Sequence, residues 1–170
     1  MPTPTQAPQE TPQAEQNAAL ELSLVNDLRE LTRVAAAIEE FCTRQGLGSQ
    51  LAYTLNLSVE EILSFSIENS FEGDKTQRIE LALHRDPSEL LILIAHDGQP
   101  LSTTQIPSSA GELILNDSNL DALGLALVHR VMDTVSVQRQ QGCNIVVMTK
   151  QIPQQQDQED AETDTQDQEQ

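Results

Sequence analysis

Residues of the types used in proton transfer and base recognition stand at two places along the chain. Glu60 and Glu61 lie in an apolar pattern with helical spacing, where a carboxylate can orient or deprotonate an attacking hydroxyl group. His96, Asp97 and Gly98 follow directly on an apolar run that reads as a strand. An acidic or imidazole side chain at such a strand end can accept a hydrogen bond from an amino group.

Two further stretches carry glycines at positions where the backbone can approach a ligand or turn sharply. Gly124 and Leu125 lie near the start of a second helical pattern, and a glycine-bearing helix N-terminus can receive phosphate groups. Gly142, Cys143 and Asn144 form the turn of a late hairpin. A nucleotide site would need an acid on a helix, an acceptor at a strand end and a glycine-bearing helix N-terminus, and three of the four stretches offer residues at such places.

The elements that must position these residues follow from apolar periodicity in the first half of the chain. Residues 19–24 alternate as a short edge strand, and Asn26 or Asp27 is expected to cap a helix that stops near Gly46. A second helix starts at Ser49 or Gln50 and ends before Gly73. Residues 77–85 and 90–95 read as a half-buried strand and a central strand.

The second half of the chain completes the order of elements. Residues 99–120 form a polar stretch of lid-like length, because structureless loops above about 12–15 residues are uncommon unless they have a function. A third helix is expected from about 120 to 132, then a hairpin of residues 135–139 and 145–150. This order predicts an α+β fold, a two-layer sandwich of a mixed, mostly antiparallel sheet and about three helices.

Length and charge limit the class of protein. A chain of 170 residues suits one domain with tails, and we predict boundaries of 1–17, 18–152 and 153–170, both end segments being disordered. The net charge is −18, and residues 154–170 carry seven carboxylates and no Lys or Arg. Such a surface repels phosphate backbones and anionic membranes, so we expect no direct nucleic-acid or membrane partner.

The chain gives no sign of secretion or membrane insertion. Residues 1–10 have neither a basic start nor an apolar run, and no stretch reaches the roughly 18 apolar residues of a membrane helix. Cys42 and Cys143 have no metal-type spacing and are expected to be free thiols. These features predict a cytoplasmic protein.

The four stretches, in this order, resemble the nucleotide-binding frame of the GHKL ATPases over about residues 18–151. The closest pattern is that of the small serine/threonine kinases that act as bacterial anti-sigma factors. Their helix reads acid-x-x-x-Asn, their strand end Asp-Asp-Gly-x-Pro-Phe, and their lid closes on Gly-Gly-x-Gly-Leu-x-Leu-Val. The resemblance implies a Bergerat-type ATP-binding fold, with ATP and Mg²⁺ as cofactors.

Mapped onto the family pattern, some site residues match and others depart. Glu61 falls at the position of the general base, although Glu60 beside it is the alternative. Phe65 stands where the family has its Mg²⁺-binding Asn, and a phenyl ring offers no lone pair to a hard cation. Asn69, one turn further on, is a substitute ligand only if it enters the metal shell.

Departures from the family pattern also occur at the strand end and in the lid motif. His96 stands at the position of the adenine-reading Asp, where a neutral imidazole still has one acceptor nitrogen. Asp97 and Gly98 keep the next two positions, and a register in which Asp97 reads adenine is the alternative. Gly124 and Leu125 match the lid motif, but its two leading glycines are replaced, by Asp121 and Ala122.

Two functional hypotheses follow from the resemblance. The first is an anti-sigma-factor-like regulator that acts by protein–protein binding with weakened or lost ATP use, and the three coincident departures favour it. The alternative is an active ATP-dependent protein serine kinase that phosphorylates an anti-anti-sigma partner with Glu61 as base. Both imply a sigma factor or a STAS-type anti-anti-sigma protein as partner, or a homodimer. A third interpretation is an unrelated α+β domain without a lid.

Overall fold

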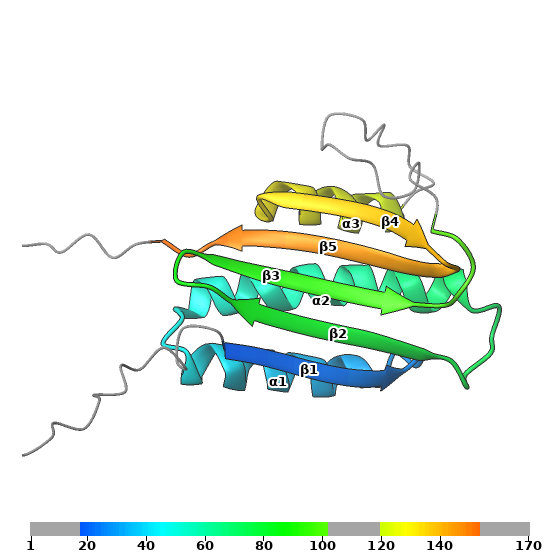
Figure 1. The fold of residues 1–170 in the computed structure, drawn as a ribbon, viewed down its shortest axis with the longest axis horizontal. Coiled ribbons are helices and arrows are strands. Elements are labelled where there is room, and N and C mark those ends of the chain that lie inside the picture. The colour runs from blue at the N-terminus through cyan, green and yellow to red at the C-terminus, as the bar shows by residue number, and fades with distance from the viewer. Residues whose placement is uncertain (1–17, 102–119, 154–170) are drawn as a thin grey trace, which may run out of the picture.

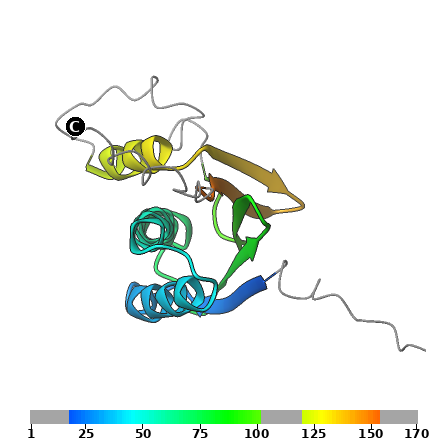
Figure 2. The same ribbon diagram turned by 90° about the vertical axis from the view of Figure 1, so that its left-hand side faces the viewer.

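The computed structural model describes residues 18–101 and 120–153, which form two layers. One layer is a five-stranded antiparallel sheet, and the three helices all lie on one face of it (Figures 1 and 2). In chain order the elements are β1 (Ala18–Val25), α1 (Glu30–Arg44), α2 (Ser49–Ser70), β2 (Arg78–Arg85), β3 (Glu89–His96), α3 (Leu120–Val131), β4 (Thr134–Gln140) and β5 (Cys143–Gln151).

The strand order β1-β2-β3-β5-β4 puts β3 and β5 side by side near the middle of the sheet. Their register pairs Ile94 with Val146 and His96 with Asn144. The end of β3 therefore meets the start of β5, although the two segments are 48 residues apart in sequence. This pairing brings the His96 turn and the late hairpin to the same end of the sheet.

Alternation along the strands builds the core. Successive side chains of a strand point to opposite faces, and on β3 the residues facing the helices are fully buried while their neighbours are only half-buried. With few aromatic residues in the chain, the core consists mainly of aliphatic side chains. Its largest fully buried members are Phe41, Leu24, Ile38, Leu55, Ile62, Leu63, Ile79, Leu81, Leu83, Leu90, Ile92 and Ile94.

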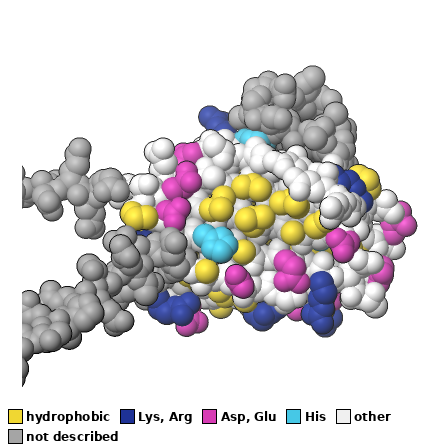
Figure 3. All heavy atoms as spheres, in the orientation of Figure 1, with side chains coloured by type: hydrophobic (Ala, Val, Ile, Leu, Met, Phe, Trp, Pro, Cys, Tyr) yellow, Lys and Arg dark blue, Asp and Glu magenta, His cyan; other side chains and the backbone are white. Residues whose placement is uncertain are grey.

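The other face of the sheet has no described helix over it. Half-buried apolar side chains of β3 and β5 gather there, among them Leu91, Leu93, Ile145 and Val147. They form the apolar band in the middle of the space-filling view, with charged side chains around it (Figure 3).

The structure confirms the predicted fold class and the predicted order of elements, and all strand pairs of the described sheet are antiparallel. One local prediction is wrong: α1 begins at Glu30, so neither Asn26 nor Asp27 caps it. The Asp27 carboxylate instead accepts a hydrogen bond from the backbone N–H of Arg29 at 3.0 Å, which closes a turn before the helix.

Several predictions concern residues outside the described part of the chain. These are the end segments 1–17 and 154–170 and nearly all of the predicted lid, residues 102–119. Within residues 18–101 and 120–153, no helix is long and apolar enough to cross a membrane, and both cysteines are free.

Candidate functional site

The predicted site residues come together where the second half of α2 faces α3 and the end of β3. Glu61 lies on α2 and Gly124 on α3, and the carboxylate of Glu61 lies directly against the glycine. A Cβ atom at position 124 would be 1.8 Å from Glu61 Oε2. Glu61 is half-buried, whereas Glu60 is exposed. Of the two neighbouring acids, Glu61 is therefore the one directed toward α3.

The next turn of α2 places an aromatic ring where the family pattern has a metal ligand. Phe65 is only 6% exposed and belongs to the hydrophobic core. Asn69 is exposed, and its Nδ2 donates a hydrogen bond to the Phe65 carbonyl oxygen at 2.8 Å. The side-chain amide of Asn69 thus donates a hydrogen bond to the backbone of its own helix. Within residues 18–101 and 120–153, no group of three or more His, Cys, Asp or Glu could hold a metal ion.

The C-terminal end of α2 packs tightly on the turn after β3. The backbone N–H of Gln99 donates to the Ser70 carbonyl oxygen at 2.6 Å. A Cβ atom on Gly98 would lie 2.6 Å from that same oxygen and 2.8 Å from Ser70 Cβ. The glycine is therefore required by the close approach of α2, which is a structural reason that applies with or without a nucleotide.

His96 is buried at this turn with its protonation state fixed by its neighbours. The Gly98 N–H donates to His96 Nδ1 at 3.3 Å, and Asn144 Nδ2 lies 3.4 Å from the same nitrogen. Because Nδ1 accepts, the proton of the neutral ring is on Nε2. Burial, and to a smaller extent the charge of Arg139, lowers the pKa of His96 to about 4, so the ring is neutral at pH 7.

The proton on His96 Nε2 has no acceptor among the described residues. The Nε2 atom is buried, and the ring packs against Phe71 with the centroids 5.0 Å apart. The ring therefore has a buried donor and no free acceptor. Adenine presents an amino group, also a donor, at the position the family reads. The acceptor nitrogen on which the sequence-based interpretation relied is already used by Gly98.

Asn144 joins the two strand ends, a role that the sequence pattern did not reveal. Its side chain is 1% exposed, and its Oδ1 accepts from the Leu101 N–H at 3.1 Å and from Arg139 Nη1 at 2.8 Å. Its Nδ2 donates to the carbonyl oxygens of Gly98 and Gln99 at 3.2 and 2.9 Å. The Gly-x-Asn spacing predicted only a hairpin, because the long-range partners of Asn144 are set by the register of β3 and β5.

A polar hollow of about 300 Å³ opens beside this turn. Three carboxylates take part in its wall, from Glu72, Asp74 and Asp97. Asp97 is exposed, and with burial as the larger cause it raises the pKa of the Cys143 thiol. A hollow with this lining repels a triphosphate, so it does not replace the predicted nucleotide site.

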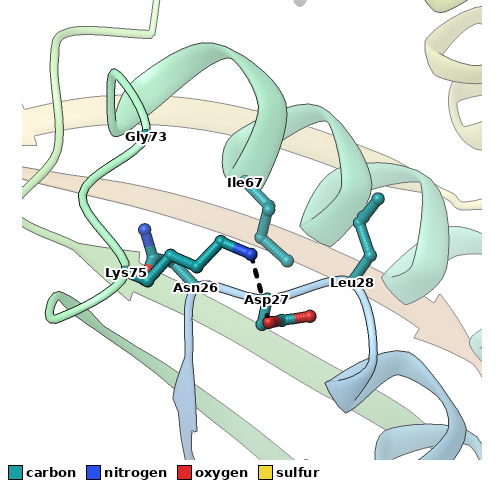
Figure 4. A pocket seen from close by; sticks show the side chains of 6 residues that line it. All are labelled: Asn26, Asp27, Leu28, Ile67, Gly73 and Lys75. Atoms are coloured by element: carbon teal, nitrogen blue, oxygen red, sulfur yellow. Dashed lines mark hydrogen bonds and ion pairs between the residues drawn. The ribbon is translucent and has the colours of Figure 1, made fainter.

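A second, smaller hollow of about 190 Å³ lies between the start of α1 and the end of α2 (Figure 4). Lys75 Nζ lies 3.4 Å from Asp27 Oδ2 across it, and Arg29 pairs with the same carboxylate. Hydrogen bonds from Arg29, with its charge and that of Lys75, hold the pKa of Asp27 well below its usual range. The hydrogen bond from Asn26 Nδ2 to the Asp74 carbonyl oxygen ties the two loops together. These contacts fasten the segment after α2 to the end of β1.

On α3 the structure describes the burial of residues from position 124 onward. Leu125 is buried in the core, so it supports the helix rather than lining an open surface. Asp121 and Ala122 belong to the first turn of α3, and their side chains lie outside the description.

ATP and Mg²⁺, the cofactors implied by the sequence resemblance, do not fit the described residues at two positions. Phe65 offers no oxygen to a cation, and His96 has no free acceptor for the adenine amino group. Glu61 and Gly124 remain compatible with the predicted pattern. The misfit therefore concerns recognition of the base and the metal rather than the position of the acid.

Comparisons with known proteins agree with the fold and the predicted family. Residues 24–150 match the model of the histidine kinase-like ATPase domain. A curated relative, the serine/threonine-protein kinase BtrW of Bordetella bronchiseptica, is 28% identical over 112 residues, which are 66% of this chain and 79% of the relative. The match excludes the interpretation of an unrelated α+β domain.

Two solved structures share the fold at low sequence identity. The RsbU and RsbW domains of Rv1364c from Mycobacterium tuberculosis superpose with a TM-score of 0.59 at 13% identity, over 79% of this chain. This chain covers only 32% of that longer one. The SiaB–SiaC complex from Pseudomonas aeruginosa gives a TM-score of 0.54 at 13% identity, over 82% of this chain and 92% of the other.

Proposed function

The chain belongs to the histidine kinase-like ATPase family, and on that premise we propose that it is an anti-sigma-factor-like regulator acting by protein–protein binding, with weakened or lost ATP use. The observation that carries this proposal is the state of His96. Its acceptor nitrogen is engaged by Gly98, so its remaining polar atom is a buried donor. With no acceptor free on His96, the hydrogen bond to the adenine amino group that the family's Asp makes is lost, which weakens binding.

Phe65 supports the same proposal from a separate segment. A buried phenyl ring at the metal position removes one oxygen ligand from the ion that would bridge the phosphates. Loss of a base contact and of a metal ligand together weakens nucleotide binding, while the core that maintains the fold is kept. A regulator that acts by binding a partner requires the fold but no nucleotide.

The partner that we propose is a sigma factor or a STAS-type anti-anti-sigma protein, bound in the cytoplasm. One solved neighbour is described as a complex of SiaB with SiaC, and the curated relative is named a serine/threonine-protein kinase. Anti-anti-sigma proteins are the substrates of this kinase branch, so they are the first partners to test. A homodimer remains part of the proposal.

The second candidate is an active protein serine kinase with Glu61 as the base. The observation that favours it is the Glu61 carboxylate, half-buried against Gly124, at the family position of the general base. In that case ATP would bind in spite of Phe65 and His96, through residues outside the described part of the chain.

Calorimetric titration of ATP with Mg²⁺ separates the two candidates. The native chain is compared with the double variant Phe65→Asn, His96→Asp, which restores both family residues. We expect no measurable heat from the native chain and binding by the double variant. Tight binding by the native protein would exclude a degenerate site and favour the kinase.

Since Phe65 is buried, the double variant needs its own folding control. Circular dichroism and thermal unfolding show whether it is folded, and the single variant His96→Asp tests base recognition with the core intact. Absence of binding by folded variants would mean that two restored residues are not sufficient. The loss of ATP use would then also involve the lid segment, where the leading glycines are replaced.

A further inference from the structure

A groove of about 800 Å³ opens at the end of the molecule opposite to the His96 turn. Its walls are the beginning of α2, the end of α3, the turn between β2 and β3, and the residues that follow β5. This is the end of the molecule that faces the viewer in Figure 2. The groove therefore lies between the same two helices that carry Glu61 and Gly124, but at their other ends.

Positive charge is concentrated in this groove. The whole chain has nine Lys and Arg residues against 27 acids, and three of the nine, Arg85, Arg130 and Lys150, line the groove. None of the described residues that line it is acidic. In a protein of net charge −18, a cluster of three cations with no carboxylate among the described lining residues attracts an anionic partner.

The three cations make few hydrogen bonds and ion pairs with the described residues. Arg130 is exposed. Arg85 donates from Nη1 to Gln45 Oε1 at 3.3 Å, while its Nε is buried and has no acceptor among the described residues. Lys150 Nζ lies 3.3 Å from Asp133 Oδ1, in a half-exposed pair of small energetic value. A further carboxylate would gain hydrogen bonds here without displacing a strong pair.

The beginning of α2 adds to the positive potential. Gly48 is its N-cap and supplies no side-chain hydrogen bond, and the first turn contains no acidic residue. Gly48, Gln50 and Leu51 all line the groove. The positive end of a 22-residue helix thus opens into it without a capping side chain.

The acidic end of the chain begins at the wall of this groove. Pro153 lines the groove, and residues 154–170 follow it with seven carboxylates and no cation. Asp157 is four residues beyond Pro153, so it can reach any point within about 14 Å. A tethered segment also has an effective concentration of the order of millimolar, which no acidic peptide free in solution matches easily.

We propose that the groove between α2 and α3 binds this chain's own acidic segment, residues 154–170, through the cations Arg85, Arg130 and Lys150. An acidic segment of another protein would have to displace it first. The groove is then occupied in the isolated protein and becomes available only in competition.

Paramagnetic broadening of amide signals tests the proposal in the full-length chain. A nitroxide label is attached at Ala161→Cys, which removes no charge, with Cys143→Ser to leave the buried Cys42 as the other thiol. The amides of Gln50, Leu51 and Arg130 report on the groove, and those of residues 72–75 report on the far end. We expect strong broadening in the groove alone, lost in about 0.5 M salt, where the Debye length is about 4 Å.

Three comparisons separate charge-driven docking from simple tethering. Changing the seven carboxylates of residues 154–170 to amides should reduce the broadening in the groove at least threefold, to about the level of a freely tethered segment. Arg130→Glu should reduce it similarly, and the matched control Arg78→Glu, an exposed arginine at the other end of the sheet, should not.

Equal broadening with acidic and neutralised segments would overturn the proposal. Mixing spin-labelled protein without ¹⁵N and ¹⁵N-labelled protein without the spin label detects transfer between molecules. Broadening of the groove amides in that mixture would assign the occupant to a second copy and would also overturn docking within one chain.

Discussion

Gly124 leaves the space that the carboxylate of Glu61 fills. A Cβ atom on Gly124 would lie 1.8 Å from Glu61 Oε2 and 2.7 Å from Cδ, so an acid on α2 and the absence of a side chain on α3 are coupled. The coupling gives this glycine a structural role within α3, where glycine costs about 1 kcal/mol relative to alanine.

Gly124→Ala should therefore displace Glu61 rather than unfold the protein, since the obstructing atoms are the far end of a flexible side chain. In the native background the gain in helix propensity is offset by this displacement. In a Glu61→Ala background the same substitution should stabilise by about 1 kcal/mol. Chemical denaturation of the four proteins in the cycle measures the coupling.

Ala126→Gly is the matched control on the same helix. It should cost about 1 kcal/mol whether or not Glu61 is present, because it changes propensity without touching the acid. If Gly124→Ala changed the free energy of unfolding equally in both backgrounds, the contact between Glu61 and Gly124 would not affect stability.

Gly98 presents the opposite case, because the atom it meets belongs to the backbone. Gly98→Ala would put a Cβ 2.6 Å from the Ser70 carbonyl oxygen, and the end of α2 would have to move. We expect a loss of about 1–3 kcal/mol of stability, the usual cost of overpacking. Gly48→Ala, where nothing lies within 4 Å of the added atom, should cost less than about 1 kcal/mol. Similar losses for the two variants would argue against a tight contact at Ser70.

The sequence predicted the elements better than the contacts between their ends. Helical spacing along α2, alternation along β2 and the continuous apolar run of β3 depend on local burial, and those elements were predicted to within a few residues. The start of α1 was predicted wrongly because Asp27 closes a turn with Arg29 instead of capping the helix. Local sequence does not distinguish these two uses of an aspartate.

The hydrogen bonds of His96 and Asn144 could not be predicted from the sequence, for a different reason. Asn144 and His96 are 48 residues apart, and only the register of β3 and β5 brings them together. The replacement of the family's Asp by His96 was visible in the sequence. That its acceptor nitrogen is already engaged by the Gly98 N–H depends on the geometry of the turn.

Asn144→Ala should be among the most destabilising polar substitutions in this protein. It leaves the Leu101 N–H and the Gln99 carbonyl oxygen without the Asn144 side chain, while the Gly98 carbonyl oxygen keeps its hydrogen bond from Arg139 Nη1. Each unsatisfied buried group costs about 1–3 kcal/mol, so we expect a loss of about 2–4 kcal/mol after relaxation. Asn69→Ala, which removes an exposed amide from α2, should cost less than about 1 kcal/mol. Equal losses measured by urea denaturation would contradict the bridging role of Asn144.

The buried imidazole of His96 predicts a specific dependence of stability on pH. Its pKa is lowered from 6.5 to about 4 in the folded state, so between these values the unfolded chain binds a proton that the folded chain does not. Stability should therefore fall as the pH falls from 6.5 toward 4, by up to about 3 kcal/mol from this group. His96→Gln should flatten this part of the profile, measured by urea denaturation at several pH values.

His129 contributes to the same part of the pH profile. Burial also lowers the pKa of His129, so His129→Gln should remove a further part of the same acid-side loss. If His96→Gln gave the same profile as the native protein, His96 would have to be protonated equally in the folded and unfolded chains. That outcome would contradict the burial of a neutral imidazole at this turn.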